Sequence, residues 1–248
     1  MRFFCSADNR AGDEIALFAP DAVHISRVLR MKKGESVVVC DDAGFEHDCV
    51  LESVGKDRVL ARIVRSRPHS TEPSVEVTVF AALSKGERFD FLIQKCVEVG
   101  ATAIVPFVSE HCVARPDERD YERKRARYAR IALEASKQSL RSRPVPVSAI
   151  QGFEQALRQA AAHETAIFLY ERENRRSFSQ ILRGSGSCAR YAVMTGPEGG
   201  FSEREARLAA CSGLEPASLG PRILRCETAP VAAVCAIMYH TGNYDIGV

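Results

Sequence analysis

The pattern of apolar and polar residues changes once along the chain, near residue 70. Before that point, a short helical pattern is followed by strand-like runs, at 21–30 for the helix and at 35–40, 46–54 and 59–64 for the strands. Gly44 and Gly55 lie between the strand-like runs, where they supply turns. Several short strands around one helix predict a small β-barrel.

The stretch at 65–73 interrupts every periodicity. It holds Pro68 and Pro73 among charged and small polar residues, a composition that is typical of a linker. We therefore expect two domains, at 1–70 and 74–248.

Beyond residue 73, apolar runs alternate with amphipathic stretches. The runs expected to form strands are 75–83, 101–108, 166–170, 191–195 and 217–219. The stretches expected to form helices are 88–99, 121–142, 152–162, 177–182, 203–211 and 229–239. This alternation predicts an α/β domain with a mostly parallel sheet and helices on both of its faces.

The composition is that of a folded globular protein. Of the 248 residues, 46% are hydrophobic and 27% are charged, which excludes the low-hydrophobicity pattern of disordered chains. The amino terminus has no apolar stretch long enough for a secretory signal. The longest uncharged apolar run, 229–239, has eleven residues, whereas a membrane span needs roughly 20. It predicts a buried helix and no membrane contact.

The cysteines indicate a reducing compartment. There are nine of them, an odd number, and no two have the CxxC spacing. We expect reduced thiols in a cytoplasmic protein, with neither a disulfide framework nor a metal site.

Positive charge is concentrated in one stretch. Residues 1–72 hold 11 Lys/Arg and 12 Asp/Glu, whereas 115–143 holds 10 Lys/Arg and 5 Asp/Glu. Five charged residues of the predicted helix are spaced by three and four positions and so share one face: Arg127, Arg130, Glu134, Lys137 and Arg141. The stripe is either a solvated helix surface or a contact with a polyanion. The same two interpretations apply to His24, Arg27 and Arg30 on the short helix.

The sequence at 195–205 has the form of a ligand-binding corner. Gly196, Gly199 and Gly200 follow an apolar strand, and Ser202 with Glu205 has capping-box spacing, so a helix should begin at residue 203. A strand, a glycine loop and a helix amino terminus together can bind a ligand, although a plain tight turn has the same pattern. The Rossmann and Walker spacings are absent, so a dinucleotide or NTP site is not supported.

A second loop, 219–230, lies between the last predicted strand and the last predicted helix. Thr228 can cap that helix, and Pro230 falls in its first turn. Arg222, Arg225 and Glu227 are charged residues between apolar segments. Taken alone, they also fit a structural ion pair.

Five fragments together resemble the ribosomal RNA small subunit methyltransferase E family of the SPOUT superfamily. The main ones are GPEGGFSEREA at 196–206 and LGPRILRCETAPVAAV at 219–234. Further matches lie at 24–30 with Gly34 and Glu35, at 95–100 and at 130–139, so the resemblance covers nearly the whole chain. Tyr128 stands where relatives are expected to have tryptophan, a change that should affect helix packing rather than chemistry.

The resemblance implies a fold and a cofactor. It implies an N-terminal PUA-like RNA-binding barrel, a C-terminal α/β domain with a deep trefoil knot, and a homodimer packed through that domain. Unknotted connections are the general rule, so the residue pattern alone does not predict the knot. The implied cofactor is S-adenosylmethionine, held by three loops at Leu169, Tyr170, Glu171, Thr195, Gly196, Pro197, Gly199, Gly200, Leu219, Gly220, Ile223 and Leu224.

The resemblance also implies methylation of uridine N3 in 16S ribosomal RNA, free or within the small ribosomal subunit. N3 carries a proton, so transfer requires a proton acceptor and a cation beside the deprotonated base. We assign the cation to Arg225 and the acceptor to Glu227 or Glu198. Expected RNA contacts are His24, Arg27, Arg30, Arg127, Arg130, Lys137, Gln138 and Arg141.

Two other functions fit parts of the sequence. One is a non-catalytic RNA-binding assembly factor, which the intact glycine loops disfavour. The other is a small-molecule enzyme with a phosphate site at 196–200, which leaves the barrel and the basic stretch unexplained.

Overall fold

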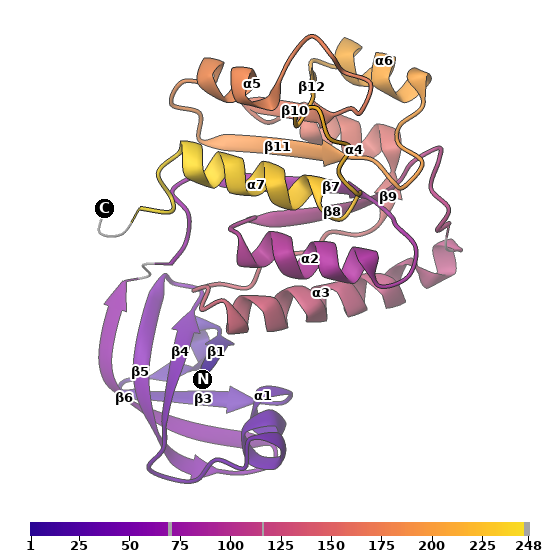
Figure 1. The fold of residues 1–248 in the computed structure, drawn as a ribbon. Helices are drawn as coiled ribbons and strands as arrows, with labels where there is room; N and C mark the ends of the chain where they lie inside the picture. The colour runs from indigo at the N-terminus through magenta and orange to yellow at the C-terminus, as the bar shows by residue number, and fades with distance from the viewer. Residues whose placement is uncertain (69–70, 116, 246–248) are drawn as a thin grey trace. The chain divides into compact units, whose positions relative to one another are not determined.

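The computed structural model describes residues 1–68, 71–115 and 117–245. The chain forms two compact units (Figure 1). The first is Met1–Glu72 with Ser136–Pro144, and the second is Pro73–Ala135 with Val145–Val248. The sequence pattern assigned the segment Ser136–Pro144 to the second domain, and the first unit contains it.

A mixed six-stranded sheet forms most of the first unit. Its strand order is β1-β4-β5-β6-β3-β2, with β1 and β4 parallel and the other neighbours antiparallel. The strands are β1 Arg2–Cys5, β2 Arg10–Ala11, β3 Glu14–Phe18, β4 Ser36–Asp41, β5 Phe45–Val54 and β6 Arg58–Pro68, and a short 3-10 helix covers Ala7–Asn9. The three predicted strands are confirmed, whereas β1, β2 and β3 were not predicted. Their inward residues, such as Phe3, Ile15 and Leu17, are buried in one apolar core.

Two predictions for the first unit are wrong in detail. The expected linker begins too early, because β6 continues to Pro68, which pairs with Phe45 of β5. His69 and Ser70 lie outside the described residues. The predicted helix at 21–30 is α1 Asp21–Val23 followed by one π-helical turn, His24–Val28. Arg30 has a φ of 53° and lies beyond the helix, so the spacing by three does not place it on one helical face with His24.

The segment Ser136–Pro144 is held in the first unit by buried polar contacts. The Arg2 guanidinium donates hydrogen bonds to the carbonyl oxygens of Leu140 (2.6 Å) and Arg141 (3.0 Å) and to the Glu46 carboxylate (3.0 Å). The Ser142 hydroxyl donates to the same carboxylate at 2.6 Å. This segment is therefore part of the fold of the first unit rather than a free basic surface.

Two of the expected RNA contacts need correction for this reason. The Arg141 side chain is 4% exposed and pairs with Glu72, and the Lys137 side chain is 10% exposed and pairs with Asp21 at 2.8 Å. Both side chains are thus engaged within the first unit, and we do not keep them among the proposed RNA contacts. The predicted shared helical face does not include Arg141, because α3 ends at Gln138 and Leu140 has a φ of 59°.

The Glu46 carboxylate makes the stability of the first unit sensitive to acid. Burial by itself raises the pKa of Glu46, but the hydrogen bond from Ser142 and the charges of Arg2 and Arg67 outweigh it and lower the pKa below its ordinary value of 4.5. A carboxyl group with a lowered pKa stabilises the fold above its ordinary pKa. That contribution is lost as the pH falls through the pKa of the folded state.

We expect Glu46→Gln to lower the free energy of unfolding by about 1.5–3 kcal/mol at pH 7, because hydrogen bonds to a buried charge are lost. Its unfolding free energy should also fall less between pH 5 and pH 3 than that of the parent protein. Urea denaturation followed by circular dichroism measures both effects. Glu52→Gln is the matched control on the same strand: its pair with Arg62 is exposed, and its loss should cost below about 1 kcal/mol. Equal losses for the two variants would contradict the role given to Glu46.

The second unit is an α/β fold. Its six strands are β7 Glu76–Ala82, β8 Ala103–Val108, β9 Gln151–Gly152, β10 Thr165–Leu169, β11 Arg190–Thr195 and β12 Glu215–Ala217. They form a sheet in the order β12-β10-β11-β7-β8-β9, and all of these pairings are parallel. The helices are α2 Arg88–Glu98, α3 Tyr121–Gln138, α4 Phe153–Ala160, α5 Phe178–Gly184, α6 Glu203–Cys211 and α7 Ala229–His240, with a 3-10 turn at Glu118–Asp120. The predicted parallel sheet and its helices are confirmed, except that the helix expected at 121–142 ends at Gln138.

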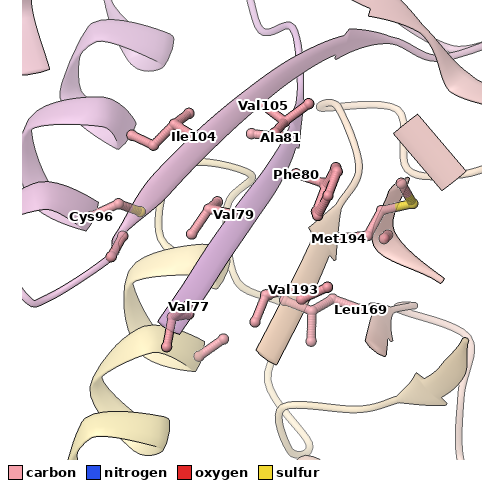
Figure 2. Packing of buried hydrophobic residues seen from close by; sticks show 14 of the residues in the cluster. Val77, Val79, Phe80, Ala81, Cys96, Ile104, Val105, Leu169, Val193 and Met194 are labelled. Carbon is pink, nitrogen blue, oxygen red and sulfur yellow. The ribbon is translucent and has the colours of Figure 1, made fainter. Parts of the chain in front are cut away.

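Successive residues of the central strand β7 are buried on both sides of the sheet. Val77, Val79 and Phe80 are at most 1% exposed, and they pack beside Val193 and Met194 of β11 (Figure 2). Helix α7 lies on β11 and β7 and contacts α2 (Figure 1). A strand that is covered on both faces explains why the sequence shows continuous apolar runs here rather than an alternation.

Helix packing also accounts for Tyr128. Its side chain is 5% exposed, and its ring lies 4.8 Å from the ring of Phe89 on α2.

None of the helices that the structure describes has the length and hydropathy of a membrane span.

Candidate functional site

Three loops that follow β10, β11 and β12 line one cavity of about 1080 Å³. In a parallel sheet, the carboxyl ends of the strands meet at one edge, which is where α/β proteins bind ligands. All twelve residues expected to hold the cofactor line this cavity: Leu169, Tyr170, Glu171, Thr195, Gly196, Pro197, Gly199, Gly200, Leu219, Gly220, Ile223 and Leu224. The three residues expected to be catalytic, Glu198, Arg225 and Glu227, line it as well.

The glycine loop after β11 is a tight turn that approaches the loop after β10. The Gly200 amide donates to the Pro197 carbonyl at 2.9 Å, and the φ of Gly200 is +68°. A Cβ at this position would lie 2.3 Å from Oε1 of Glu171. The left-handed backbone of Gly200 therefore favours glycine, and a side chain there would have to displace the exposed carboxylate of Glu171.

The capping box at the start of α6 is confirmed. The Ser202 hydroxyl accepts from the Glu205 amide, and the Glu205 carboxylate accepts from the Ser202 amide at 3.0 Å. Glu205 is 3% exposed and also accepts from the Ser109 hydroxyl and the Glu110 amide, both at 2.9 Å. The carboxylate thus fixes the end of the glycine loop to the loop after β8.

The loop between β12 and α7 is braced by its own polar groups. The Ser218 hydroxyl donates to the Gly220 carbonyl and accepts from the Gly220 amide, and Gly220 has a φ of +111°. Thr228 occupies the N-cap position of α7, but its backbone is helical and its side chain makes no capping hydrogen bond, so the predicted Thr228 cap is wrong. Pro230 lies in the first turn, as predicted.

Glu198 is held by groups that are distant in sequence. Its Oε1 accepts from the Lys85 amide at 2.9 Å and from the Arg88 guanidinium at 3.1 Å. Arg88 is the first residue of α2 and lines the cavity, and sequence reasoning missed it. This pairing fastens the glycine loop to the segment between β7 and α2.

Glu227 lies among several charges in the same cavity. Burial raises its pKa, but its own backbone amide, the Cys226 thiol and the charges of Arg88 and Arg225 outweigh burial, so the pKa lies below its ordinary value of 4.5. The Cys226 thiol donates to Oε2 of Glu227 at 3.2 Å. Burial and then the neighbouring carboxylates raise the pKa of Cys226 to about 12, so this thiol stays protonated. Glu227 is therefore an ionised carboxylate at neutral pH.

The sequence of this loop also allowed a structural ion pair between one of its arginines and Glu227, and the described residues do not form it. Among the described residues, neither Arg222 nor Arg225 forms an ion pair with Glu227, and both arginines are exposed. Their guanidinium groups are available to a ligand in the cavity.

Sequence reasoning missed the wall formed by the loop after β10 and by α5. The unpredicted lining residues there are Glu173, Asn174, Arg175, Arg176, Ser177, Ser179, Gln180 and Arg183. The signal was a stretch at 171–176 in which every residue but Asn174 is charged, shortly after a buried strand.

The remaining residues expected to contact RNA lie outside the cavity and belong to both units. Arg27 and Arg30 are exposed in the first unit, whereas His24 is partly buried beside the Phe3 ring. Gln138 is also exposed in the first unit, at the end of α3. Arg127 and Arg130 are exposed on α3 in the second unit, where Arg127 pairs with Asp90.

Comparisons with known proteins assign both parts of the chain. Residues 71–238 match the model of an RNA methyltransferase domain, and residues 19–64 match that of an RNA methyltransferase PUA domain. The chain is 33% identical over 249 residues to the ribosomal RNA small subunit methyltransferase E of Bacillus subtilis, covering 97% of each chain.

Two solved structures are similar over almost their full length. The ribosomal RNA small subunit methyltransferase E of Neisseria gonorrhoeae, bound to S-adenosylmethionine, has a TM-score of 0.85 and 32% identity, and 96% of each chain is covered. A methyltransferase of Legionella pneumophila in complex with the same cofactor has a TM-score of 0.85 and 28% identity, again over 96% of each chain.

Proposed function

Because this chain belongs to the ribosomal RNA small subunit methyltransferase E family, an RNA methyltransferase family, we propose that it methylates N3 of a uridine in 16S ribosomal RNA. The observation that carries the proposal is a single cavity. All three predicted cofactor loops line it, and so do a cation, Arg225, and an ionised carboxylate, Glu227. Methylation of a weakly acidic nitrogen requires this combination of groups.

The cavity fits the cofactor of the family, S-adenosylmethionine. It combines glycine turns at Gly200 and Gly220, where no side chain keeps a ligand from the backbone, with the apolar residues Leu169, Leu219 and Leu224. Such a lining can receive an adenine ring and read its edge through backbone groups. When bound, the cofactor supplies an electrophilic methyl group on a sulfonium ion.

The residues of the chain then act on the base. N3 lies on the Watson–Crick edge of uridine, so the base enters the cavity unpaired. Glu227 accepts the N3 proton, and Arg225 stabilises the negative charge that deprotonation leaves on the base. Glu198 has a different task, because its Oε1 is occupied by Lys85 and Arg88. It keeps the glycine loop in place.

The proposal is tested by mass spectrometry of nucleosides from 16S ribosomal RNA of cells with and without this gene. We expect 3-methyluridine to disappear from the RNA of the deletion strain and to return when the gene is restored. An unchanged 3-methyluridine content would refute the uridine N3 assignment. Calorimetry with S-adenosylmethionine covers the alternative of a non-catalytic assembly factor, for which no binding at millimolar cofactor is expected.

Gly200 provides a test of the cofactor cradle. We expect Gly200→Ala to weaken S-adenosylmethionine binding by about tenfold or more, because the added Cβ strains the left-handed turn within the cavity and displaces the Glu171 carboxylate that lines it. Isothermal titration calorimetry measures the change.

The matched control for Gly200→Ala is Gly213→Ala. Gly213 has a φ of +88°, a Cβ added there would have no other atom within 4 Å, and the residue is not part of the cavity lining. Both variants should lose roughly 1–2 kcal/mol of stability from backbone strain. A similar loss of cofactor affinity in both would mean that strain alone explains the effect.

The remaining features implied by the family resemblance are part of the proposal. We propose domains at 1–70 and 74–248, with Ser136–Pro144 of the second stretch contributing to the first unit. We also propose a cytoplasmic location, where ribosomal RNA is found, and RNA contacts through the exposed Arg27, Arg30, Arg127, Arg130 and Gln138 and through His24. A homodimer through α7 is supported by the exposure of Tyr239 (79%) on this helix and of Ile223 (86%) in the loop before it. Light scattering should give the mass of two chains.

We also propose the trefoil knot. The proposal is supported by the last crossover of the chain: β12 pairs with β10, and the chain then returns so that α7 contacts β11 and β7. Electron density that traces residues 165–240 without a threaded segment would contradict it.

A further inference from the structure

We propose that Arg175, Arg183 and Arg222 form a phosphate clamp on one wall of the cavity, which binds the RNA backbone next to the target uridine. This inference rests on the proposed function and extends it to residues for which the comparisons give no role. Three observations support it: the size of the cavity, the hydrogen-bonded backbone of the loop after β10, and the absence of ion pairs at these three arginines among the described residues.

The cavity is large for one small ligand. Its volume of about 1080 Å³ lies slightly above the ~300–1,000 Å³ range of pockets that hold a single small molecule. The later part of the loop after β10, from Glu173 onward, and helix α5 extend its lining beyond the residues assigned to the cofactor. A second occupant, the flipped nucleotide with its phosphates, can therefore share the cavity.

The backbone of the loop that carries Arg175 is fixed by hydrogen bonds. The Glu173 carboxylate accepts from the amides of Arg175 (2.6 Å) and Arg176 (3.1 Å), and the Glu173 amide donates to the Tyr170 carbonyl at 3.0 Å. The Ser218 amide donates to the Arg176 carbonyl at 3.0 Å, which ties this loop to the one that carries Arg222. The loop is thus ordered before any ligand binds, which reduces the entropic cost of binding.

The cavity arginines fall into two groups. Arg88 pairs with Glu198, and Arg176 pairs with Glu215, so these two charges are neutralised within the protein. By contrast, within the described part of the chain, the structure has no ion pair for Arg175, Arg183 or Arg222, and all three are exposed. Of the cavity carboxylates near them, Glu173 is already occupied by the two backbone amides.

Guanidinium groups at a cavity wall are well suited to bind phosphate groups. Each presents a planar pair of N–H donors that matches two phosphate oxygens, and the charge remains at any physiological pH. A single-stranded RNA that places one base in the cavity brings a phosphate on each side of that base. The carboxylate of S-adenosylmethionine is the other anion that could meet these arginines, and the experiment separates the two.

The test compares two triple variants that remove the same charge. One is Arg175→Gln, Arg183→Gln and Arg222→Gln. The control is Arg158→Gln, Arg204→Gln and Arg207→Gln, three exposed arginines of the same unit that do not line the cavity. Fluorescence anisotropy with a labelled 16S fragment measures RNA affinity across a salt titration, and calorimetry measures S-adenosylmethionine affinity.

We expect the cavity triple to bind RNA at least about tenfold more weakly at 0.1 M salt and its salt slope to fall by about 2, at ~0.7 per lost phosphate contact. The control triple should change both quantities far less, and neither triple should change S-adenosylmethionine affinity more than about twofold. Equal RNA losses in the two triples would overturn the clamp, since net charge would explain them. Weaker cofactor binding with unchanged RNA binding would also overturn it, in favour of a cofactor carboxylate site.

The RNA readout requires no methyl transfer, so the two proposals fail separately. A parent protein that binds the fragment without methylating it would contradict the proposed function and leave the clamp to be judged on binding. A parent protein that binds no RNA would overturn both.

Discussion

Turnover should fall about 10²–10³-fold when Arg225 is replaced by alanine, with RNA and S-adenosylmethionine both saturating. The expected magnitude is that of removing one charge-stabilising donor from an active site. Arg225 lines the cavity, is exposed, and lies close enough to Glu227 for its charge to lower the pKa of that carboxyl. Its charge therefore lies in the cavity in which we propose that the deprotonated uridine binds.

Single-turnover transfer of a radiolabelled methyl group to a 16S fragment measures the effect of Arg225→Ala. Calorimetry should give a cofactor affinity within about twofold of the parent, because the interaction develops with charge on the base rather than with cofactor binding. Arg207→Ala is the control, since Arg207 is exposed on α6 and outside the cavity lining. Turnover at the parental rate would remove Arg225 from the role.

The sequence predicts the second unit well because its elements are strongly patterned. Strands buried on both sides, such as β7 and β11, appear as continuous apolar runs, and the helices between them carry a period of 3.6. Capping residues fixed one boundary to the residue: Ser202 and Glu205 predicted that α6 begins at residue 203, where it does begin.

The first unit was predicted less completely, for two physical reasons. β1, β2 and β3 are two to five residues long, too short for a period to be recognised. The segment Ser136–Pro144 belongs to the unit through the Arg2, Glu46 and Ser142 contacts, which join residues about a hundred positions apart. Spacing along a helix shows which side chains share a face, but not whether that face meets water or another part of the chain.

The candidate site, too, was predicted only where its features are local in the sequence. The glycine loops were predicted, because a turn that follows a strand and precedes a helix is a local feature. The pairing of Arg88 with Glu198 was not, because these residues are 110 positions apart and each is an ordinary surface residue in its own context. This pairing changes the catalytic hypothesis: of the two carboxylates offered as the proton acceptor, Glu198 is committed to holding a loop.

The exchange of each carboxylate for its amide should therefore have different consequences. We expect Glu227→Gln to lower turnover about 10²-fold at pH 7, the lower end of the range for a positioned proton acceptor. Glu198→Gln retains an oxygen for the Lys85 amide and loses only the charge facing Arg88, so its turnover should stay within about threefold of the parent protein. A higher KM for S-adenosylmethionine is expected instead, because the glycine loop is less firmly held.

The dependence of turnover on pH separates the acceptor from a structural residue. The pKa of Glu227 is lowered, so its carboxylate is ionised above its ordinary pKa and loses its ability to accept a proton only as the pH falls through that lowered value. The parent protein should thus show no loss of rate from this group between pH 6 and pH 8. In Glu227→Gln the N3 proton has to leave to solvent, and turnover should rise by about tenfold per pH unit over the same interval. Parallel pH profiles for Glu227→Gln and the parent protein would show that Glu227 is not the acceptor, and a steep profile confined to Glu198→Gln would reverse the assignment.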